Sequence, residues 1–322
     1  MAFTRRGLLS GFAATFAGIP KLRAQESKWP TRPLRIIIPT APGGSPGITS
    51  RLLGDKITSR LGQSIVVESL TAGGGVPGLQ QVSKSTDEHT FAMLTGGFAT
   101  QAAVLKNLPY RPLEDFTFIT SVVRYPIVYA VKPDSPIKDF KDYIERAKAS
   151  PNQVSNGIAA AGSVYHLLGK WVDNLAGTEI NLVFYRGTAP ALQDVLGGRI
   201  DVLTDAATSV IPRIRSGQLR ALAVTSPERY PLLPDVPTMA ETVPGIQVES
   251  WLGLASAPNT PNPIVERLNA EIRWALELPD VRKWASDSGV LPAPSTPDEF
   301  RKRVAGDVKQ WTEIVVRNKI SI

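Results

Sequence analysis

The fold of this chain is constrained most by an alternation of short, β-branched apolar runs with amphipathic windows, which repeats from residue 34 onwards. Strands are expected at residues 34–38, 64–68, 90–94, 116–131, 154–156, 181–184, 200–203, 219–224 and 250–255. Helices are expected at residues 48–61, 79–85, 140–149, 164–175, 190–196 and 210–216, with two or three more after residue 255. Strands that alternate with helices predict an α/β fold with largely parallel sheets flanked by helices.

The length of 322 residues favours two domains, because one compact core rarely needs so long a chain. The extended stretch 116–131 is interrupted at Tyr125 and Pro126, which we interpret as the first crossing between the domains. A proline-rich passage after residue 225 is interpreted as the connection back to the first domain. The sequence therefore predicts a first domain of residues 26–125 and 225–322 and a second of residues 126–224. In such folds the ligand lies between the domains, at the carboxyl ends of strands.

The first 25 residues have the pattern of an export signal. Arg5 and Arg6 precede an apolar stretch, residues 8–19, that is too short to span a bilayer, and the small residue Ala24 follows. The arginine pair and the weakly hydrophobic stretch favour the twin-arginine route, with the Sec route left open. We expect residues 1–25 to be a signal peptide cleaved near Ala24, and the mature protein to be periplasmic.

Composition excludes several classes of site. The chain has no cysteine, which excludes disulfides, thiolate metal sites and cysteine nucleophiles. Its two histidines, His89 and His166, are far apart in the sequence, so a histidine metal cluster is not expected. The net charge of +7 includes four basic residues of the first 25; without them, 32 basic residues face 29 acidic ones, and no basic run remains. Nucleic-acid binding is therefore not expected.

Two glycine loops follow a strand and precede a helix, and each matches a catalytic motif by letter. Residues 43–47 fit the G-x-S-x-G nucleophile elbow of serine hydrolases. Two prolines, Pro39 and Pro42, would break the strand that must lead into an elbow, so an exported hydrolase using Ser45 remains an alternative only. Residues 73–78 fit the G-x-G-x-x-G dinucleotide motif, but the next strand ends without an acidic residue, and we expect no cofactor.

Both glycine loops instead place backbone N–H groups at a helix start, where the helix dipole favours an anion. Two such ends that face one cleft would hold a carboxylate without any catalytic residue. Residues 161–163, just before the helix that carries His166, form a third candidate loop. Arg186 could reach the cleft or lie in solvent, and Asp205 could cap the next helix or face the cleft. Neither paired catalytic acids nor a cluster of metal-binding acids is visible in the sequence.

Seven sequence runs, taken in order, carry a resemblance over nearly all of the chain that follows the signal. They are PTAPGG, ESLTAGGGVPG, LPYRPLEDFTFI, GSVYHLLG, VFYRGTAPALQDVLGGRIDVLTD, IRSGQLRALAVTSPERYPLLPDVPTMAET and PGIQVESWLGLASAPNTPNPIVERLNAEI. With these runs the chain resembles the substrate-binding proteins of tripartite tricarboxylate transporters, also called Bug proteins. Residues 219–241 and 250–254 are the most specific part of the match.

This resemblance implies a periplasmic-binding-protein fold of two domains that close on a carboxylate and present it to membrane permease subunits, without catalysis, cofactor or metal. We also expect a monomer. In the family, main-chain amides and ordered waters of the first two glycine loops hold the carboxylate. Carried over to this sequence, the ligand-binding residues are Thr40, Gly43, Gly44, Ser45, Ala72, Gly73, Gly74, Thr95, Gly96, Gly162, Ser163, Arg186, Gly187 and Asp205.

The chain departs from the family pattern at three places. Family members commonly have an aromatic residue where this chain has Thr40 and an aspartate where it has Gly47, and residues 70–71 are Leu-Thr in place of Arg-Pro. A smaller residue and a lost negative charge favour a bulkier or more anionic ligand than a small amino acid, such as a di- or tricarboxylate or an aromatic carboxylate. A sensor partner that binds the same ligand and signals to a membrane kinase remains a further alternative.

Overall fold

The computed structural model describes residues 29–159 and 162–320. The signal peptide expected at residues 1–25 and its cleavage near Ala24 lie outside these residues. No helix in the described part of the chain is long and apolar enough to cross a membrane.

The strands of the described residues form one mixed sheet. They are β1 (Leu34–Ile38), β2 (Ile65–Ser69), β3 (Thr90–Thr95), β4 (Thr117–Val131), β5 (Ser155–Ala159), β6 (Asn181–Tyr185), β7 (Val202–Ala206), β8 (Arg220–Val224), β9 (Glu249–Ser256) and β10 (Leu291–Pro292). Their order is β2-β1-β3-β9-β4-β7-β5-β6, with β8 and β10 paired to β4. Strands β1 to β3 are parallel, as are β5 to β7, whereas β9 is antiparallel to both β3 and β4.

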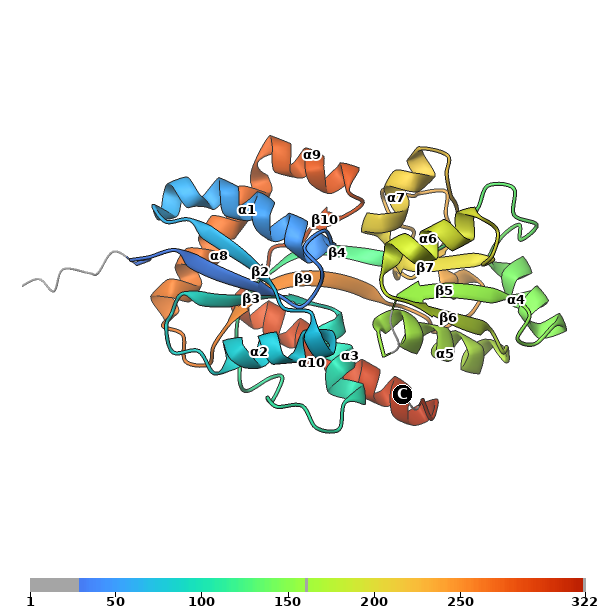
Figure 1. The fold of residues 1–322 in the computed structure, drawn as a ribbon, viewed down its shortest axis with the longest axis horizontal. Helices are drawn as coiled ribbons and strands as arrows, with labels where there is room; N and C mark the ends of the chain where they lie inside the picture. The colour runs from blue at the N-terminus through green and yellow to red at the C-terminus, as the bar shows by residue number, and fades with distance from the viewer. Residues whose placement is uncertain (1–28, 160–161, 321–322) are drawn as a thin grey trace, which may run out of the picture.

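Helices cover both faces of this sheet (Figure 1). They are α1 (Ser45–Leu61), α2 (Val76–Ser83), α3 (Gly97–Val104), α4 (Phe140–Ala149), α5 (Val164–Ala176), α6 (Thr188–Leu196), α7 (Ala207–Arg215), α8 (Asn262–Glu277), α9 (Pro279–Asp287) and α10 (Pro297–Arg317). Two short 3₁₀ turns, η1 (Ala72–Gly75) and η2 (Met239–Glu241), lie in connections. The predicted α/β class, with parallel strands joined by helices, is confirmed.

The long strand β4 joins two groups of elements. Its residues 117–126 pair with β9, and its residues 127–131 pair with β7 and β8. We call β1 to β3 with α1 to α3 the first lobe and β5 to β8 with α4 to α7 the second lobe; Figure 1 shows β4 and β9 running between them. The change of pairing partner falls beside Pro126, where the sequence analysis places a crossing.

The end of the passage after β8 packs with the second lobe. Met239, Val243 and Ile246 are buried in the same core cluster as the side chains of α4 and α5. The Val248 N–H donates to the Thr225 carbonyl at 2.8 Å, which holds the two ends of the passage together. Residues 239–248, which the sequence analysis assigns to the first domain, therefore pack with the second lobe. Tyr230, earlier in the passage, lies instead in the core cluster that also holds side chains of β1, α1 and α8, and its hydroxyl donates to the Gly289 carbonyl at 3.1 Å. The division into domains at residues 125 and 225 stays a prediction.

The C-terminal helix α10 contacts both lobes. Near its start, Phe300 is fully buried against Gly253 of β9, where an added Cβ would lie 2.1 Å from the ring. Near its end, the rings of Trp311 and Trp171 of α5 meet at 6.2 Å between centroids, at 72°. Helix α10 therefore ties the outer part of the second lobe to the strands that connect the lobes.

Candidate functional site

The first glycine loop, residues 39–44, connects β1 to α1. The sequence Pro-Gly-Gly-Ser-Pro ends the strand at Ile38 and starts α1 with Gly44 as its N-cap and a proline in the first turn. The Gly44 N–H donates to the Ala41 carbonyl at 3.0 Å, so this expected ligand donor is already used. Among the described residues, the N–H groups of Gly43 and Ser45 have no acceptor and stay available at the positive end of α1.

The backbone of this loop is held from two sides. The Ser69 hydroxyl at the end of β2 donates to the Thr40 carbonyl at 2.5 Å, and the Arg51 guanidinium of α1 donates to the Pro42 carbonyl. The Thr40 hydroxyl is buried and has no hydrogen-bond partner in the described part of the chain. A buried hydroxyl without a partner is costly in a folded protein, so a bound polar group is one way to satisfy it.

The second glycine loop is the turn η1 between β2 and α2. After Thr71 in the right-handed region, Gly73, Gly74 and Gly75 have φ angles of 54°, 69° and 87°. Left-handed residues that follow right-handed ones turn successive N–H groups toward one side and form a concave nest for an anion. The predicted donors from Ala72 to Gly74 lie on this turn.

The two glycine loops touch each other. A Cβ added to Gly75 would lie 2.2 Å from Cβ and 2.6 Å from Cα of Pro39, which only glycine permits. The Gln101 side chain of α3 supports the second loop from the other side, because its Nε2 donates to the Gly74 carbonyl at 2.8 Å. The nest and the start of α1 therefore belong to one site of the first lobe.

The end of β3 brings Thr95 and Gly96 beside β9. The Gly96 N–H donates to the Trp251 carbonyl at 3.2 Å, and a Cβ at Gly96 would lie 2.8 Å from Oγ of Ser250. The Gly97 N–H donates to Oγ1 of Thr95, also at 3.2 Å. These expected site residues thus connect the glycine loops to β9. The Gly96 N–H already donates to the Trp251 carbonyl, so it is not free to donate to a ligand.

The third candidate loop of the sequence analysis starts α5, and its residue 161 lies outside the described part. The Ser163 hydroxyl caps α5, accepting from the His166 N–H at 3.4 Å, and donates to the Ala159 carbonyl at 2.6 Å. The Gly162 N–H donates to Nδ1 of His166 at 3.1 Å, so it too has an acceptor. Burial lowers the pKa of His166, and the N–H donor at Nδ1 and the start of the helix also favour the neutral ring.

Asp205 is the last residue but one of β7 in the second lobe and is 3% exposed. One of its carboxylate oxygens accepts from the Ala206 N–H, at the start of α7, at 2.6 Å. Burial raises the pKa of the Asp205 carboxyl, and hydrogen bonds from the hydroxyls of Thr188 and Tyr165 act against this rise. Asp205 is therefore both a local helix-start contact and a buried carboxyl between α5, α6 and α7.

Two residues at the crossing of the lobes link Asp205 to the first lobe. Burial raises the pKa of Tyr125 of β4 to about 12; a hydrogen bond with Ser250 opposes this rise and the charge of Asp205 adds to it. Ser250 of β9 in turn touches Gly96. Contacts therefore run from Gly96 through Ser250 to Tyr125, which pairs with Ser250 between β4 and β9, and the charge of Asp205 acts on Tyr125 from the second lobe.

Arg186 is not part of these contacts. Its side chain is exposed, and within residues 29–159 and 162–320 it forms neither an ion pair nor a side-chain hydrogen bond. The following Gly187 has a φ of 112° and is the N-cap of α6. Both residues lie at the rim of the second lobe, at the carboxyl end of β6, where a bound anion could still meet the guanidinium.

In the described part of the chain, neither histidine hydrogen-bonds to Ser45, the nucleophile of the hydrolase alternative. His166 accepts the Gly162 N–H, and His89 interacts through its two ring nitrogens with the Asp87 carbonyl and the Thr31 backbone. Both histidines of the chain are therefore occupied away from Ser45. The described residues also hold no group of three or more histidines and acids placed to bind a metal ion.

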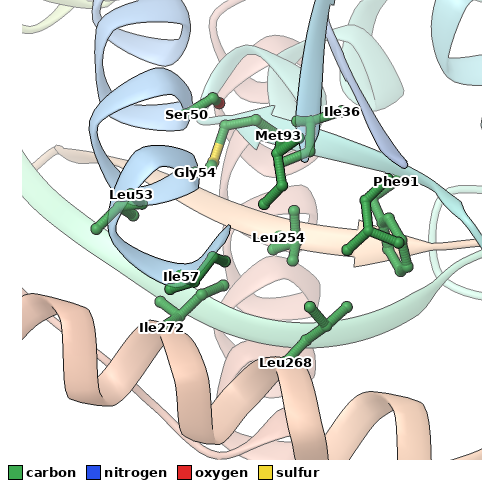
Figure 2. Close-up of a pocket in the computed structure, with 12 residues that line it drawn as sticks. Ile36, Ser50, Leu53, Gly54, Ile57, Phe91, Met93, Leu254, Leu268 and Ile272 are labelled. Atoms are coloured by element: carbon green, nitrogen blue, oxygen red, sulfur yellow. The ribbon is translucent and has the colours of Figure 1, made fainter. Parts of the chain in front are cut away.

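A separate small cavity of about 20 Å³ lies between α1 and α8, against the sheet (Figure 2). Figure 2 shows aliphatic side chains of α1, α8 and β9, among them Leu53, Ile272 and Leu254, around it. Its polar feature is the Ser50 hydroxyl, which is buried without a partner in the described residues. The cavity has room for little more than one water molecule, so it is no site for an organic acid.

Five residues of the site were not singled out from the sequence as site residues: Gln101, Tyr125, Tyr165, Thr188 and Ser250. Three of them lie within the runs that carry the family resemblance, in GSVYHLLG, VFYRGTAP and VESWLG. Tyr165 and Thr188 lie at helix starts, and this position is the signal that could have found them; Ser250, inside β9, has no such signal. Gln101 has no such signal, since it reaches the second loop from the side of α3.

Comparison with known proteins identifies the family of the chain. Residues 49–320 match the model of the tripartite tricarboxylate transporter family receptor, and this match spans most of the chain. The protein BugT of Bordetella pertussis is 32% identical over 319 residues, which cover 98% of each chain. The chain belongs to the tripartite tricarboxylate transporter receptor family.

Solved structures of similar proteins support the fold of this family member. The protein MatC of Rhodopseudomonas palustris, solved with bound malate, is 30% identical with a TM-score of 0.80, over 89% of this receptor chain and 100% of its own. A second R. palustris protein, solved with adipate, is 29% identical with a TM-score of 0.83, over 91% and 99%. The predicted two-domain fold of a periplasmic binding protein is thereby confirmed.

Proposed function

We propose that this receptor captures an organic carboxylate in the periplasm and delivers it to the membrane subunits of a tripartite tricarboxylate transporter, without transforming it. The observation that carries this proposal is the contact between the two glycine loops. It brings an anion-binding nest of backbone N–H groups against the positive end of α1, with an unpartnered Thr40 hydroxyl beside them. Such a site binds a carboxylate through backbone N–H groups, and no group of histidines and acids in the described residues is placed to hold a metal ion.

The charge around the loops supports an anionic ligand. Neither α1 nor α2 has an acidic residue in its first turn, so nothing opposes the dipole of either helix at the loops. The carboxylate would accept hydrogen bonds from Gly43, Ser45 and the residues Ala72 to Gly74. The residues Thr95, Gly96, Gly162, Ser163, Arg186, Gly187 and Asp205 would surround the rest of the ligand, Gly96 and Gly162 by contact rather than through their amides.

The size and charge of the ligand are proposed from two positions, Thr40 and Gly47, at which this chain lacks the aromatic residue and the aspartate that family members commonly have. A Cβ at Gly47 would lie 2.3 Å from the Pro42 carbonyl oxygen, so this loop cannot take the aspartate that relatives carry there without moving. The start of α1 therefore stays free of negative charge. Because similar proteins were solved with malate and with adipate, we propose a di- or tricarboxylate or an aromatic carboxylate.

A ligand screen tests the proposal. Malate, adipate, citrate, benzoate, aspartate and glutamate are added in turn, and the thermal unfolding of the mature chain is followed. At a hundred times its Kd, a ligand stabilises the folded state by about 2.7 kcal/mol, which is a shift of several degrees. Sole, tight binding of aspartate or glutamate would contradict the size argument, and no stabilisation by any carboxylate would contradict the function.

Two further measurements separate the receptor from its alternatives. Closure of the lobes on a ligand predicts a smaller radius of gyration in X-ray scattering at saturation, for a particle with the mass of a monomer. A hydrolase using Ser45 predicts ester turnover that Ser45→Ala abolishes, whereas the receptor predicts none. Genes for permease subunits beside the gene of this chain, and cleavage near Ala24 on export, would support the delivery step.

A further inference from the structure

The first glycine loop contains a tight turn whose central peptide can face either of two ways. The Gly44 N–H donates to the Ala41 carbonyl at 3.0 Å, which closes a β-turn with Pro42 and Gly43 at its two central positions. Proline followed by glycine at these positions favours a type II turn, in which the glycine has a positive φ. Gly43 does not have a positive φ, which excludes type II and fits a type I turn.

The two turn types present opposite sides of the peptide between Pro42 and Gly43. This peptide is trans, so its carbonyl and its N–H point in opposite directions. Between type I and type II the peptide rotates by about 180°, and the carbonyl and the N–H exchange sides. The type of turn therefore determines on which side Gly43, an expected ligand donor, offers its N–H.

Helix α1 holds the Pro42 carbonyl in the observed orientation. The Arg51 guanidinium donates to this carbonyl oxygen. Gly47 lies four residues before Arg51, on the same face of α1, and leaves room for the oxygen, because an added Cβ there would lie 2.3 Å from it. The carbonyl therefore lies against this face of α1. The Gly43 N–H points away from it and has no acceptor in the described part of the chain.

Other roles do not explain where the Arg51 side chain lies. It is exposed and forms no ion pair within the described residues, although Asp55 follows at the spacing of a helical ion pair. The helix dipole favours cations at the other end of a helix, so a cation in the second turn of α1 gains nothing from it. The contact with the Pro42 carbonyl is what remains.

We propose that Arg51 is a positioning residue, which keeps the peptide between Pro42 and Gly43 in the type I orientation and so keeps the Gly43 N–H facing the bound carboxylate. This inference rests on the proposed function. Without the guanidinium, the Pro-Gly sequence lets the turn pass to type II, where the Pro42 carbonyl takes the place of the N–H and repels a carboxylate. The observed Kd then rises by the inverse of the fraction of molecules that keep the type I turn.

A cycle of two substitutions tests this inference. Arg51→Met removes the donor and keeps an unbranched side chain. Gly43→Ala keeps the N–H, places its Cβ where no atom lies within 4 Å, and disfavours the positive φ that type II needs. Wild type, both single variants and the double variant are titrated calorimetrically with malate and with adipate.

The effect of Arg51→Met should depend on residue 43. With glycine there, we expect a Kd about tenfold higher, which corresponds to a type I fraction of about one tenth. In the Gly43→Ala background, we expect Arg51→Met to raise the Kd less than about threefold, because the turn can no longer flip. The charge of the guanidinium is lost in both backgrounds, so the difference between the two Kd ratios measures the turn.

Two further measurements complete the test. Arg146→Met is the control, because Arg146 of α4 likewise donates to a proline carbonyl ahead of its helix, that of Pro136 at 3.1 Å, but in the second lobe. We expect it to bind like the wild type. A crystal structure of Arg51→Met without ligand should show a positive φ at Gly43, and it reports the turn even where Gly43→Ala binds too weakly to be titrated.

The outcomes separate the inference from the function on which it rests. Equal Kd ratios in the two backgrounds, an equal loss in Arg146→Met, or a type I turn in the crystal of Arg51→Met overturns the role of Arg51 and leaves the carboxylate receptor intact. If no acid of the ligand screen binds the wild type, the proposed function fails, and the crystal of Arg51→Met still shows whether Arg51 sets the turn.

Discussion

Replacing Gly75 by alanine is expected to separate the two glycine loops and to weaken carboxylate binding. Gly75 has a φ of 87°, and an added Cβ would lie 2.2 Å from Cβ of Pro39. Carbon atoms in ordinary contact are about 3.5–4.0 Å apart, so the loops must move apart by about 1.5 Å. The matched control is Gly62→Ala at the end of α1, where φ is 73° and no atom lies within 4 Å of the added Cβ.

Both variants are destabilised by a left-handed φ in a residue with a side chain, but only Gly75→Ala also separates the two loops. A left-handed φ in a residue with a side chain costs about 1–2 kcal/mol, so both variants should unfold a few degrees below the wild type. A displacement of 1.5 Å removes a hydrogen bond of about 3 Å, and a hydrogen bond to a charged group contributes about 1.5–3 kcal/mol. The loss of one such bond in Gly75→Ala predicts a Kd at least about tenfold higher.

The assay is calorimetric titration of both variants and the wild type with the tightest carboxylate of the screen, together with thermal unfolding. Gly62 lies at the other end of a 17-residue helix, about 25 Å from the loops, so Gly62→Ala should bind like the wild type. Wild-type affinity in Gly75→Ala, or an equal loss of affinity in both variants, would refute the idea that contact between the loops builds the site.

Three further changes are expected to have separate effects. Gln101→Met removes the donor to the Gly74 carbonyl, so calorimetry should show a Kd about two- to tenfold higher, while thermal unfolding stays within a degree or two of the wild type. Ser50→Ala removes a buried hydroxyl without a partner and should raise the free energy of unfolding in urea by about 1 kcal/mol; a decrease would contradict this. The Arg229 guanidinium lowers the pKa of Glu241 from 4.5 to about 2, so its stabilising charge is lost as the pH falls through this range. Thermal unfolding of the wild type and of Glu241→Gln should therefore converge toward pH 2, and a constant difference would count against the ion pair.

Much of the fold could be predicted from the sequence, because the hydrophobic periodicity agrees with the capping residues and prolines that mark where helices and strands begin and end. Helix α4 was expected at residues 140–149, where the structure has it, and its start is fixed by the Asp139 side chain, which accepts from the Asp142 N–H. Strand β1 was likewise expected at 34–38, since its buried apolar run stops at Pro39. Where a cap and an apolar pattern coincide, the sequence defines the element.

Elements without such agreement were missed or shifted. Helix α3 (Gly97–Val104) was not predicted, because glycines form its N-cap and its first residue and because it is apolar on most sides, so it shows no periodic pattern. Strands β5 and β7 extend to Ala159 and Ala206, past the predicted ends at 156 and 203, because pairing with their neighbours rather than side-chain pattern determines their length. The packing of residues 239–248 on the second lobe is a tertiary contact that the proline content does not reveal.

The site was predicted in outline, and its details depend on contacts between distant segments. The glycine loops could be named from strand, glycine and helix order alone. The acceptor of the Gly96 N–H could not be predicted, because it is the carbonyl of Trp251 on β9, far away in the sequence. The acceptors of the Gly44 and Gly162 N–H groups are only three and four residues away, but local pattern alone does not show which groups they bind. The burial of the Asp205 side chain also depends on tertiary packing, which its position before α7 does not reveal.

A crystal structure of the mature chain with the carboxylate that stabilises it most tests the central claim directly. We predict a carboxylate oxygen about 3 Å from the backbone nitrogens of Ser45 and of residues 72–74, with no covalent change in the ligand. A ligand held by side chains elsewhere, with these backbone N–H groups turned away from it, would contradict the account.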